Sequence, residues 1–195
     1  MKLFRTVLWV LVAVAAIAAG VLVLHQSSPR PSKTAATNVS FGGPFTLVDG
    51  AGQPFASSKL AGRPYAIFFG FTHCPDVCPT TLARLVKLRR QLGSDDAFQI
   101  VFVTVDPERD GPKEVGNYAG LFGSKIIGLT GSAAQIAQVK KDYGIFSEKV
   151  GTGDNYTVDH TATVLLFGKD QKFQATIAPD DSDAAALGKL KLLTA

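Results

Sequence analysis

The chain has 195 residues, which is enough for one ordinary domain and an additional short segment. Its formal net charge is +4, and two of these charges come from Lys2 and Arg5, so the remainder is nearly balanced. Because the basic residues do not gather with aromatic ones, the composition gives no sign of a nucleic-acid-binding surface. Only two cysteines and three histidines are present, so any thiol or soft-metal site must use very few residues.

The first 25 residues have the pattern of a membrane anchor. Val7–Leu24 is an apolar run of 18 residues without a charge, close to the roughly 20 residues that span a bilayer core. A cleaved signal peptide usually has an apolar region of about 7–15 residues and a small-residue cleavage site, and no clear site follows Leu24. We therefore predict an uncleaved anchor over residues 1–25, with Lys2 and Arg5 favouring a cytoplasmic N-terminus. The lack of an Arg- and Ser-rich transit segment favours a bacterial protein.

Residues 26–41 are rich in Ser, Thr and Pro and have no apolar periodicity, which is typical of a flexible tether. Residues 42–195 then make up a single domain. These segments predict a single-pass protein of the bacterial inner membrane whose C-terminal domain faces the periplasm. In that compartment the two cysteines can be oxidised unless another protein keeps them reduced.

The domain is predicted to begin with a β-hairpin, because PFTLVDGAGQPF places an Asp-Gly turn between two short strands. Apolar runs over 65–71 and 98–105 predict strands that are buried on both faces. Between them, helical spacing predicts a helix over 80–92, with Thr80 or Thr81 as its N-cap. The remaining predicted elements are a helix from near Pro112, a strand over 125–130, a helix over 132–143, an irregular segment over 145–159, strands over 161–167 and 172–177, and an amphipathic helix over 180–193.

This order of elements predicts an α/β fold. Strands that alternate with helices imply parallel pairs joined by crossovers. The closing hairpin and final helix complete a mixed sheet with helices on both faces. This is the thioredoxin-like arrangement, here with an extra N-terminal β-hairpin.

Both cysteines lie in FFGFTHCPDVCPTTL, between a predicted buried strand and a predicted helix. α/β folds place their sites where strands end, and the positive end of a helix favours a thiolate. Cys74 and Cys78 have three possible roles: a structural disulfide, a redox pair without the usual two-residue spacer, or a metal site. Two thiolates suit Cu(I), whereas zinc needs more ligands than this pair supplies. Asp76 lies between them, where its charge opposes thiolate formation and attracts a cation.

The three histidines are the candidates for a further ligand. His25 ends the apolar run, and His73 is too close to Cys74 in sequence to share a metal comfortably with it. His160 lies just before the predicted strand over 161–167. In thioredoxin-like domains the residue before this strand faces the redox loop. His160 is therefore either an ordinary loop histidine or a ligand supplied from a distant part of the chain.

Three segments together resemble the Sco/SenC family, whose members assist cytochrome c oxidase assembly: FFGFTHCPDVCPTTL, VFVTVDPERD and YTVDHTATVLLF. The resemblance runs from about Phe41 to the end of the chain. It implies a thioredoxin-like fold and a copper site, for Cu(I) or Cu(II), with Cys74, Cys78 and His160 as ligands. Asp76 and Asp159 are then candidates for orienting the ligands from outside.

Two further groups in these segments receive structural interpretations. We interpret the VDPERD sequence, residues 105–110, as a turn that ends a strand and pairs its arginine with its carboxylates. Phe69 and Phe71 precede the cysteine loop and are expected to belong to the core rather than to a contact surface.

The resemblance also implies a function. The expected role is a metallochaperone that delivers copper to the binuclear copper site of oxidase subunit II, with a periplasmic copper carrier or thiol reductant as a further partner. The alternative is a thiol–disulfide oxidoreductase that reduces the cysteines of that site or serves periplasmic redox and copper homeostasis. Cys74 and Cys78 would then be a catalytic redox pair. The metal role requires both thiols reduced, whereas the oxidoreductase role cycles them, so the sequence leaves enzymatic activity open.

Overall fold

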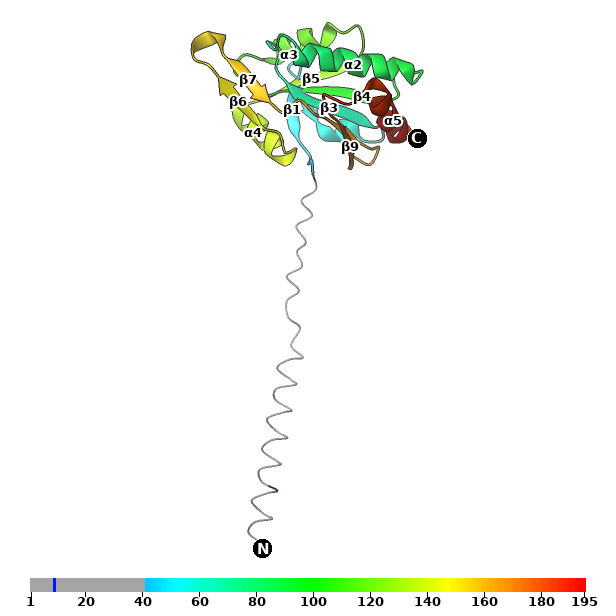
Figure 1. The fold of residues 1–195 in the computed structure, drawn as a ribbon. Helices are drawn as coiled ribbons and strands as arrows, with labels where there is room; N and C mark the ends of the chain where they lie inside the picture. The colour runs from blue at the N-terminus through cyan, green and yellow to red at the C-terminus, as the bar shows by residue number, and fades with distance from the viewer. Residues whose placement is uncertain (1–8, 10–40) are drawn as a thin grey trace. The chain divides into compact units, whose positions relative to one another are not determined.

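The computed structural model describes residue 9 and residues 41–195, and the folded domain belongs to the second of these ranges (Figure 1). The predicted anchor over residues 1–25, apart from Trp9, and the tether to residue 40 lie outside the described residues. Within the described part of the chain, no helix combines the length and the apolar content needed to cross a bilayer.

A seven-stranded mixed sheet forms the centre of the domain, in the order β2-β1-β5-β4-β3-β8-β9. Its middle is parallel, because β4 pairs with β3 on one side and with β5 on the other. All other pairings in this sheet are antiparallel. The strands are β1 (Thr46–Asp49), β2 (Pro54–Ala56), β3 (Tyr65–Gly70), β4 (Gln99–Thr104), β5 (Ile126–Thr130), β8 (Val164–Phe167) and β9 (Phe173–Ile177).

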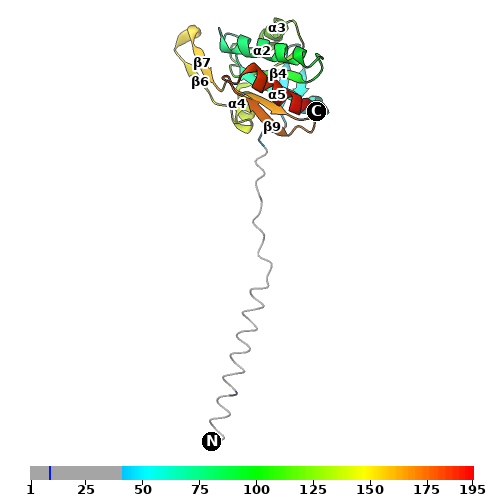
Figure 2. The same ribbon diagram turned by 45° about the vertical axis from the view of Figure 1, so that its right-hand side comes forward.

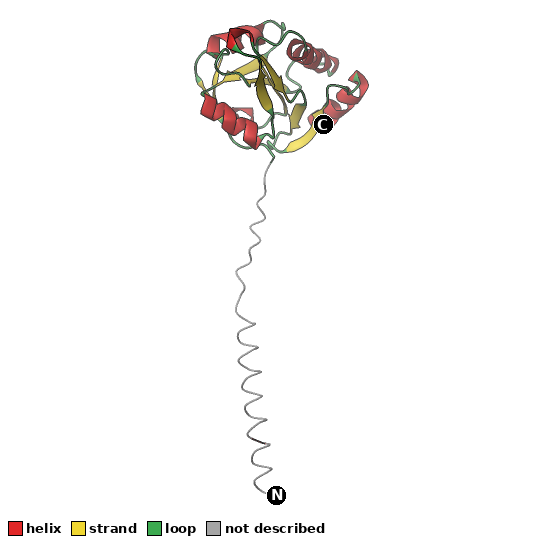
Figure 3. Ribbon diagram, turned by 60° about the vertical axis from the view of Figure 1, so that its left-hand side comes forward, coloured by secondary structure: helices red, strands yellow, loops and turns green. Residues whose placement is uncertain are grey.

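Helices cover both sides of this sheet, as Figure 3 shows. They are α2 (Val77–Gln91), α3 (Pro112–Gly120), α4 (Ala133–Asp142) and α5 (Asp183–Thr194), with short 3-10 helices at η1 (Ser57–Leu60) and η2 (Gly153–Asn155). Neighbouring side chains of a strand point to opposite faces. Phe69 packs against Tyr143 at the end of α4, so Phe68 and Gly70 face the side that carries α2 and its Cys78. The predicted thioredoxin-like fold is confirmed.

The predicted N-terminal hairpin is also present. β1 and β2 pair in antiparallel register, with Leu47 opposite Phe55. The Asp49 carboxylate accepts hydrogen bonds from the backbone N–H groups of Ala51 and Gln53, which closes the turn. Pairing of β1 with β5 then joins the hairpin to the main sheet.

The two strands that position the site are β3 and β4, and every residue in both is buried. Parallel strands covered on both faces require continuous apolar runs, which is why the sequence predicted them well. Since they run side by side in the same direction, their carboxyl ends lie at the same edge of the sheet. The cysteine loop follows β3 at this edge, and the VDPERD turn follows β4.

The irregular segment predicted over 145–159 is wrong. The structure forms a hairpin there, from β6 (Ser147–Val150) to β7 (Thr157–His160), as a separate two-stranded sheet at one side of the domain (Figure 2). β6 reads Ser-Glu-Lys-Val and is mostly exposed, and Val158 is the one buried residue of β7. Without an alternating apolar pattern, the sequence carried no strand signal.

The predicted start of helix α2 also needs correction. The helix begins at Val77 with Asp76 at the N-cap position, rather than after Thr80 or Thr81. Pro79 falls within the first turn, where a proline is tolerated because the N–H groups there have no intrahelical acceptor. Cys78 therefore lies inside the first turn of the helix instead of before it.

Candidate metal centre

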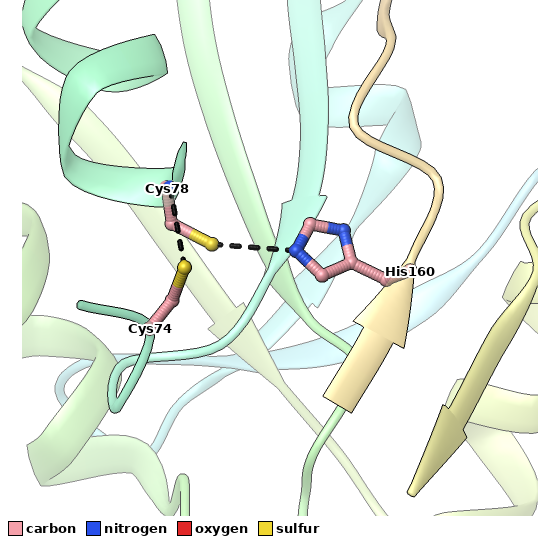
Figure 4. A group of neighbouring side chains, drawn as sticks. All are labelled: Cys74, Cys78 and His160. Atoms are coloured by element: carbon pink, nitrogen blue, oxygen red, sulfur yellow. Dashed lines mark hydrogen bonds between the residues drawn. The ribbon is translucent and has the colours of Figure 1, made fainter. Parts of the chain in front are cut away.

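Three side chains from distant parts of the chain meet at the edge of the sheet (Figure 4). Cys74 lies in the loop after β3, Cys78 in the first turn of α2, and His160 at the last position of β7. Their sulfur and nitrogen ligand atoms all lie within 4.8 Å of one another. The structure thus brings together the three residues that the sequence named as ligands.

The two thiols differ in exposure. Cys78 is buried and Cys74 is half-buried, and both are free. The backbone N–H of Cys78 has no acceptor within the helix and donates to the Sγ of Cys74 at 3.4 Å. Burial raises the pKa of the Cys78 thiol, so this group keeps its proton at neutral pH until a metal ion displaces it. The first turn of the helix therefore orients the more accessible sulfur.

His160 presents one ring nitrogen to the thiols. Its Nδ1 lies 3.0 Å from the carbonyl oxygen of Thr161, which can only accept, so Nδ1 carries the proton. Nε2 then has the free lone pair, and it lies 3.4 Å from the Sγ of Cys78. Burial also lowers the pKa of His160, which keeps the imidazole neutral at pH 7. The rings of Phe68 and Phe71 pack edge-on against the imidazole and fix its plane.

This set of donors fits copper. Two thiolates and a neutral imidazole are soft or intermediate ligands, and a histidine ligand usually donates its other N–H to a carbonyl, as His160 does. Among the described residues, no further Cys, His, Asp or Glu joins the three. A structural zinc site closed by protein ligands would need another donor. The geometry favours an ion that accepts low coordination.

Comparison with known proteins agrees with the assignment of these residues to a copper site. A family model described as SCO1/SenC matches residues 33–195. The chain belongs to the SCO1/SenC family.

Some relatives of this SCO1/SenC protein match it over nearly all of their length. An SCO2-like protein of Rickettsia conorii is 35% identical over 185 residues, which cover 89% of this chain and 90% of the relative. The structure of Bradyrhizobium japonicum ScoI with copper bound is 40% identical, with a TM-score of 0.71, over 78% of this chain and 99% of that one. Arabidopsis thaliana ScoI with copper bound has the same TM-score at 32% identity and the same coverage.

The other residues singled out in the sequence lie outside the group of three. Asp76 and Asp159 are exposed, and neither donates to or accepts from a ligand side chain in the described residues. The orienting role predicted for them finds no support in the structure. His73 is exposed and contacts the Thr72 hydroxyl and the Asp110 carboxylate instead of the thiols. His25 lies outside the described residues.

Asp110 is the important residue that sequence reasoning missed. Its carboxylate is fully buried and accepts from the backbone N–H of Thr72, the Thr72 hydroxyl and the Thr104 hydroxyl, at 2.8, 2.5 and 2.7 Å. It therefore ties the start of the cysteine loop to the end of β4. The sequence offered one signal, a second aspartate in VDPERD beyond the one that pairs with arginine. The predicted pairing itself is confirmed, with Arg109 Nε donating to Asp106 at 2.6 Å.

Gly70 provides the space that the buried thiol occupies. A Cβ at this position would lie 2.8 Å from the Sγ of Cys78 and 3.0 Å from Phe68. We expect Gly70→Ala to lower the free energy of unfolding by about 1–3 kcal/mol through overpacking. Urea denaturation measures this free energy. Gly188→Ala is the control, because the helical position of Gly188 has open space around it. Equal stability of Gly70→Ala and wild type would contradict this packing.

The buried thiol also predicts a pH dependence for the reduced, metal-free protein. The pKa of Cys78 is raised above its ordinary value of 9.0 by burial, so above pH 9 the folded state binds more protons than the unfolded state. Stability should be unaffected below that pH and fall as the pH rises beyond it, by up to about 1.4 kcal/mol per pH unit. Urea denaturation between pH 8 and 10 measures the slope. A Cys78→Ser variant should lose this contribution, and an unchanged slope would contradict it.

Proposed function

We propose that this SCO1/SenC protein is a copper-binding metallochaperone with Cys74, Cys78 and His160 as its ligands. The observation that carries the proposal is the convergence of three metal donors within 4.8 Å, from a loop, a helix and a hairpin. In the metal-free state the Cys78 thiol can donate to the lone pair of His160, and a metal ion that takes the place of this proton would be held by both groups. The copper-bound structures of two relatives support the choice of metal.

The difference in exposure between the thiols suits a protein that passes copper on. Cys74 is half-buried and reachable by a partner's ligand, whereas Cys78 is the buried donor of the three. A copper ion held as cargo can then exchange ligands one at a time, with Cys74 as the first to be replaced. Because both thiols must be reduced to bind metal, loading depends on the redox state of the compartment.

The family and the sequence support a proposal for the recipient and the location. We propose delivery to the binuclear copper site of cytochrome c oxidase subunit II, with a periplasmic copper carrier or thiol reductant as a second partner. The apolar run Val7–Leu24 supports an inner-membrane anchor, and the following residues 26–41 support a tether that leaves the domain in the periplasm.

The test is metal analysis of the purified, reduced chain loaded with Cu(I). We expect about one copper per chain, because the three donors form one site. The Cys74→Ser/Cys78→Ser double variant serves as the matched comparison, since serine keeps the size of the side chain and removes the soft donor. Copper bound equally by the double variant would exclude this site.

A second function is favoured by one observation. The Sγ of Cys74 is half-buried and accepts a hydrogen bond from a free helix N–H, which is the arrangement of an attacking thiol. A thiol–disulfide oxidoreductase would reduce an oxidised dithiol peptide at a useful rate, and His160→Ala would leave that rate largely unchanged. A reduction potential too oxidising to reduce the partner's disulfide would count against this alternative.

A further inference from the structure

The position of His160 depends on a hairpin that has no strand pairing with the main sheet. β6 and β7 pair only with one another, whereas Cys74 and Cys78 follow the fully buried central strand β3. Side-chain contacts between the hairpin and the body of the domain therefore help to fix the distance from imidazole to thiols, together with the short link from His160 to β8. Those contacts are therefore candidates for controlling how close His160 lies to the two thiols.

One arginine contacts the residue just before β7 in two ways. Arg109 donates from Nε to Asp106 and from Nη1 to the carbonyl oxygen of Tyr156, at 2.6 and 2.9 Å. Its guanidinium stacks 3.6 Å from the centre of the Tyr156 ring. The Tyr156 hydroxyl donates to the other oxygen of the buried Asp106 carboxylate at 2.7 Å. We call Asp106, Arg109 and Tyr156 the hairpin clamp.

The clamp also lies near the residue that leads into the cysteine loop. The guanidinium of Arg109 lies 5.9 Å from the ring of Phe71, and that ring packs 5.8 Å from the imidazole of His160. Arg109 thus lies close to Phe71, which precedes the cysteine loop, and stacks on Tyr156, which precedes β7. An additional ion pair between Glu108 and Lys149 lies on the same side of the hairpin but is exposed, so it contributes little.

We propose that Arg109 is a positioning residue that holds His160 against the thiols and thereby sets the preference of the site between Cu(II) and Cu(I). This inference rests on the proposed copper binding. Two thiolates are sufficient soft donors for Cu(I), whereas Cu(II) depends on the imidazole. Loosening the hairpin should therefore weaken Cu(II) binding and leave Cu(I) binding nearly intact.

The experiment compares Arg109→Gln with the wild-type chain. We expect the Cu(II) affinity to fall by about 10–100-fold, the range typical for partners that orient a metal ligand. We expect the Cu(I) affinity, measured by competition with a colorimetric chelator, to change by less than about 3-fold because both thiols stay in place. Nuclear magnetic resonance of the metal-free variant should show changed chemical shifts for the His160 ring. Arg90→Gln is the matched control, because Arg90 donates to Gly123 far from the site.

The outcomes separate the inference from its alternatives. Unchanged Cu(II) affinity in Arg109→Gln would overturn the positioning role, and equal loss of both affinities would show a general structural effect and overturn it too. If Arg109→Gln fails to fold, Tyr156→Phe decides by the same criteria, since it removes one hydrogen bond to Asp106 and keeps the stacked ring. A wild-type chain that binds no Cu(I) would overturn the proposed function instead, and the His160 resonance of the metal-free variant would still test the positioning role.

Discussion

Replacing His160 with alanine is expected to lower the Cu(II) affinity of this SCO1/SenC protein by more than about 100-fold, since even residues that only orient a ligand cost 10–100-fold. The imidazole is the single nitrogen donor of the group, and its lone pair faces the thiols because Nδ1 is committed to the Thr161 carbonyl. Cu(II) prefers a nitrogen-containing ligand set, so the loss should be large. Cu(I) binding should fall far less, because Cys74 and Cys78 remain.

The measurement is a pair of affinities on the same variant, Cu(II) by titration of the visible absorption and Cu(I) by chelator competition. His73→Ala is the matched control, because this histidine is adjacent to Cys74 in sequence but contacts Thr72 and Asp110. Its Cu(II) affinity should stay near the wild-type value. Similar losses in both variants, or an unchanged Cu(II) affinity in His160→Ala, would remove His160 from the ligand set.

The sequence was sufficient for the parts of the site that short, continuous patterns encode. β3 and β4 are unbroken apolar runs, and the cysteine loop follows β3 directly, so their placement required no knowledge of distant contacts. Recognising His160 as a third ligand required the fold, because only the topology returns residue 160 to residue 78. The order of the predicted strands and helices gave that topology, and the family resemblance then implied His160 as a ligand.

The sequence was insufficient where tertiary contacts decide the outcome. The β6–β7 hairpin is polar and mostly exposed, and side chains of the clamp hold it in place instead of an apolar face of its own. Asp110 looks like any turn aspartate until the structure shows its carboxylate buried beneath the cysteine loop. Asp76 and Asp159, which are closer to the ligands in sequence, are exposed and make no hydrogen bond with the ligand side chains in the described residues.

The Asp110 carboxylate is expected to be among the most important polar groups for stability. Asp110→Ala would leave the N–H and hydroxyl of Thr72 and the hydroxyl of Thr104 without their acceptor. We expect a loss of about 3–5 kcal/mol, because a buried donor without a partner costs about 1–3 kcal/mol and such losses are not fully additive. Asp110→Asn keeps the shape and one oxygen but turns an amide N–H towards a donor, so about 1–3 kcal/mol is expected.

Urea denaturation of the reduced, metal-free chain measures both variants, with the exposed Asp76→Ala as the control that should stay within about 0.5 kcal/mol of wild type. Near-wild-type stability of Asp110→Ala would contradict the network.

Copper binding by the folded Asp110→Asn variant tests whether the cysteine loop and the hairpin are positioned separately. Asp110 anchors the loop that bears Cys74, whereas its neighbour Arg109 anchors the hairpin that bears His160. Loosening the loop should weaken Cu(I) and Cu(II) together, since both ions need the thiols, whereas Arg109→Gln should weaken Cu(II) alone. A loss of both affinities in one variant and of Cu(II) affinity alone in the other would mean that VDPERD positions the two halves of the site independently.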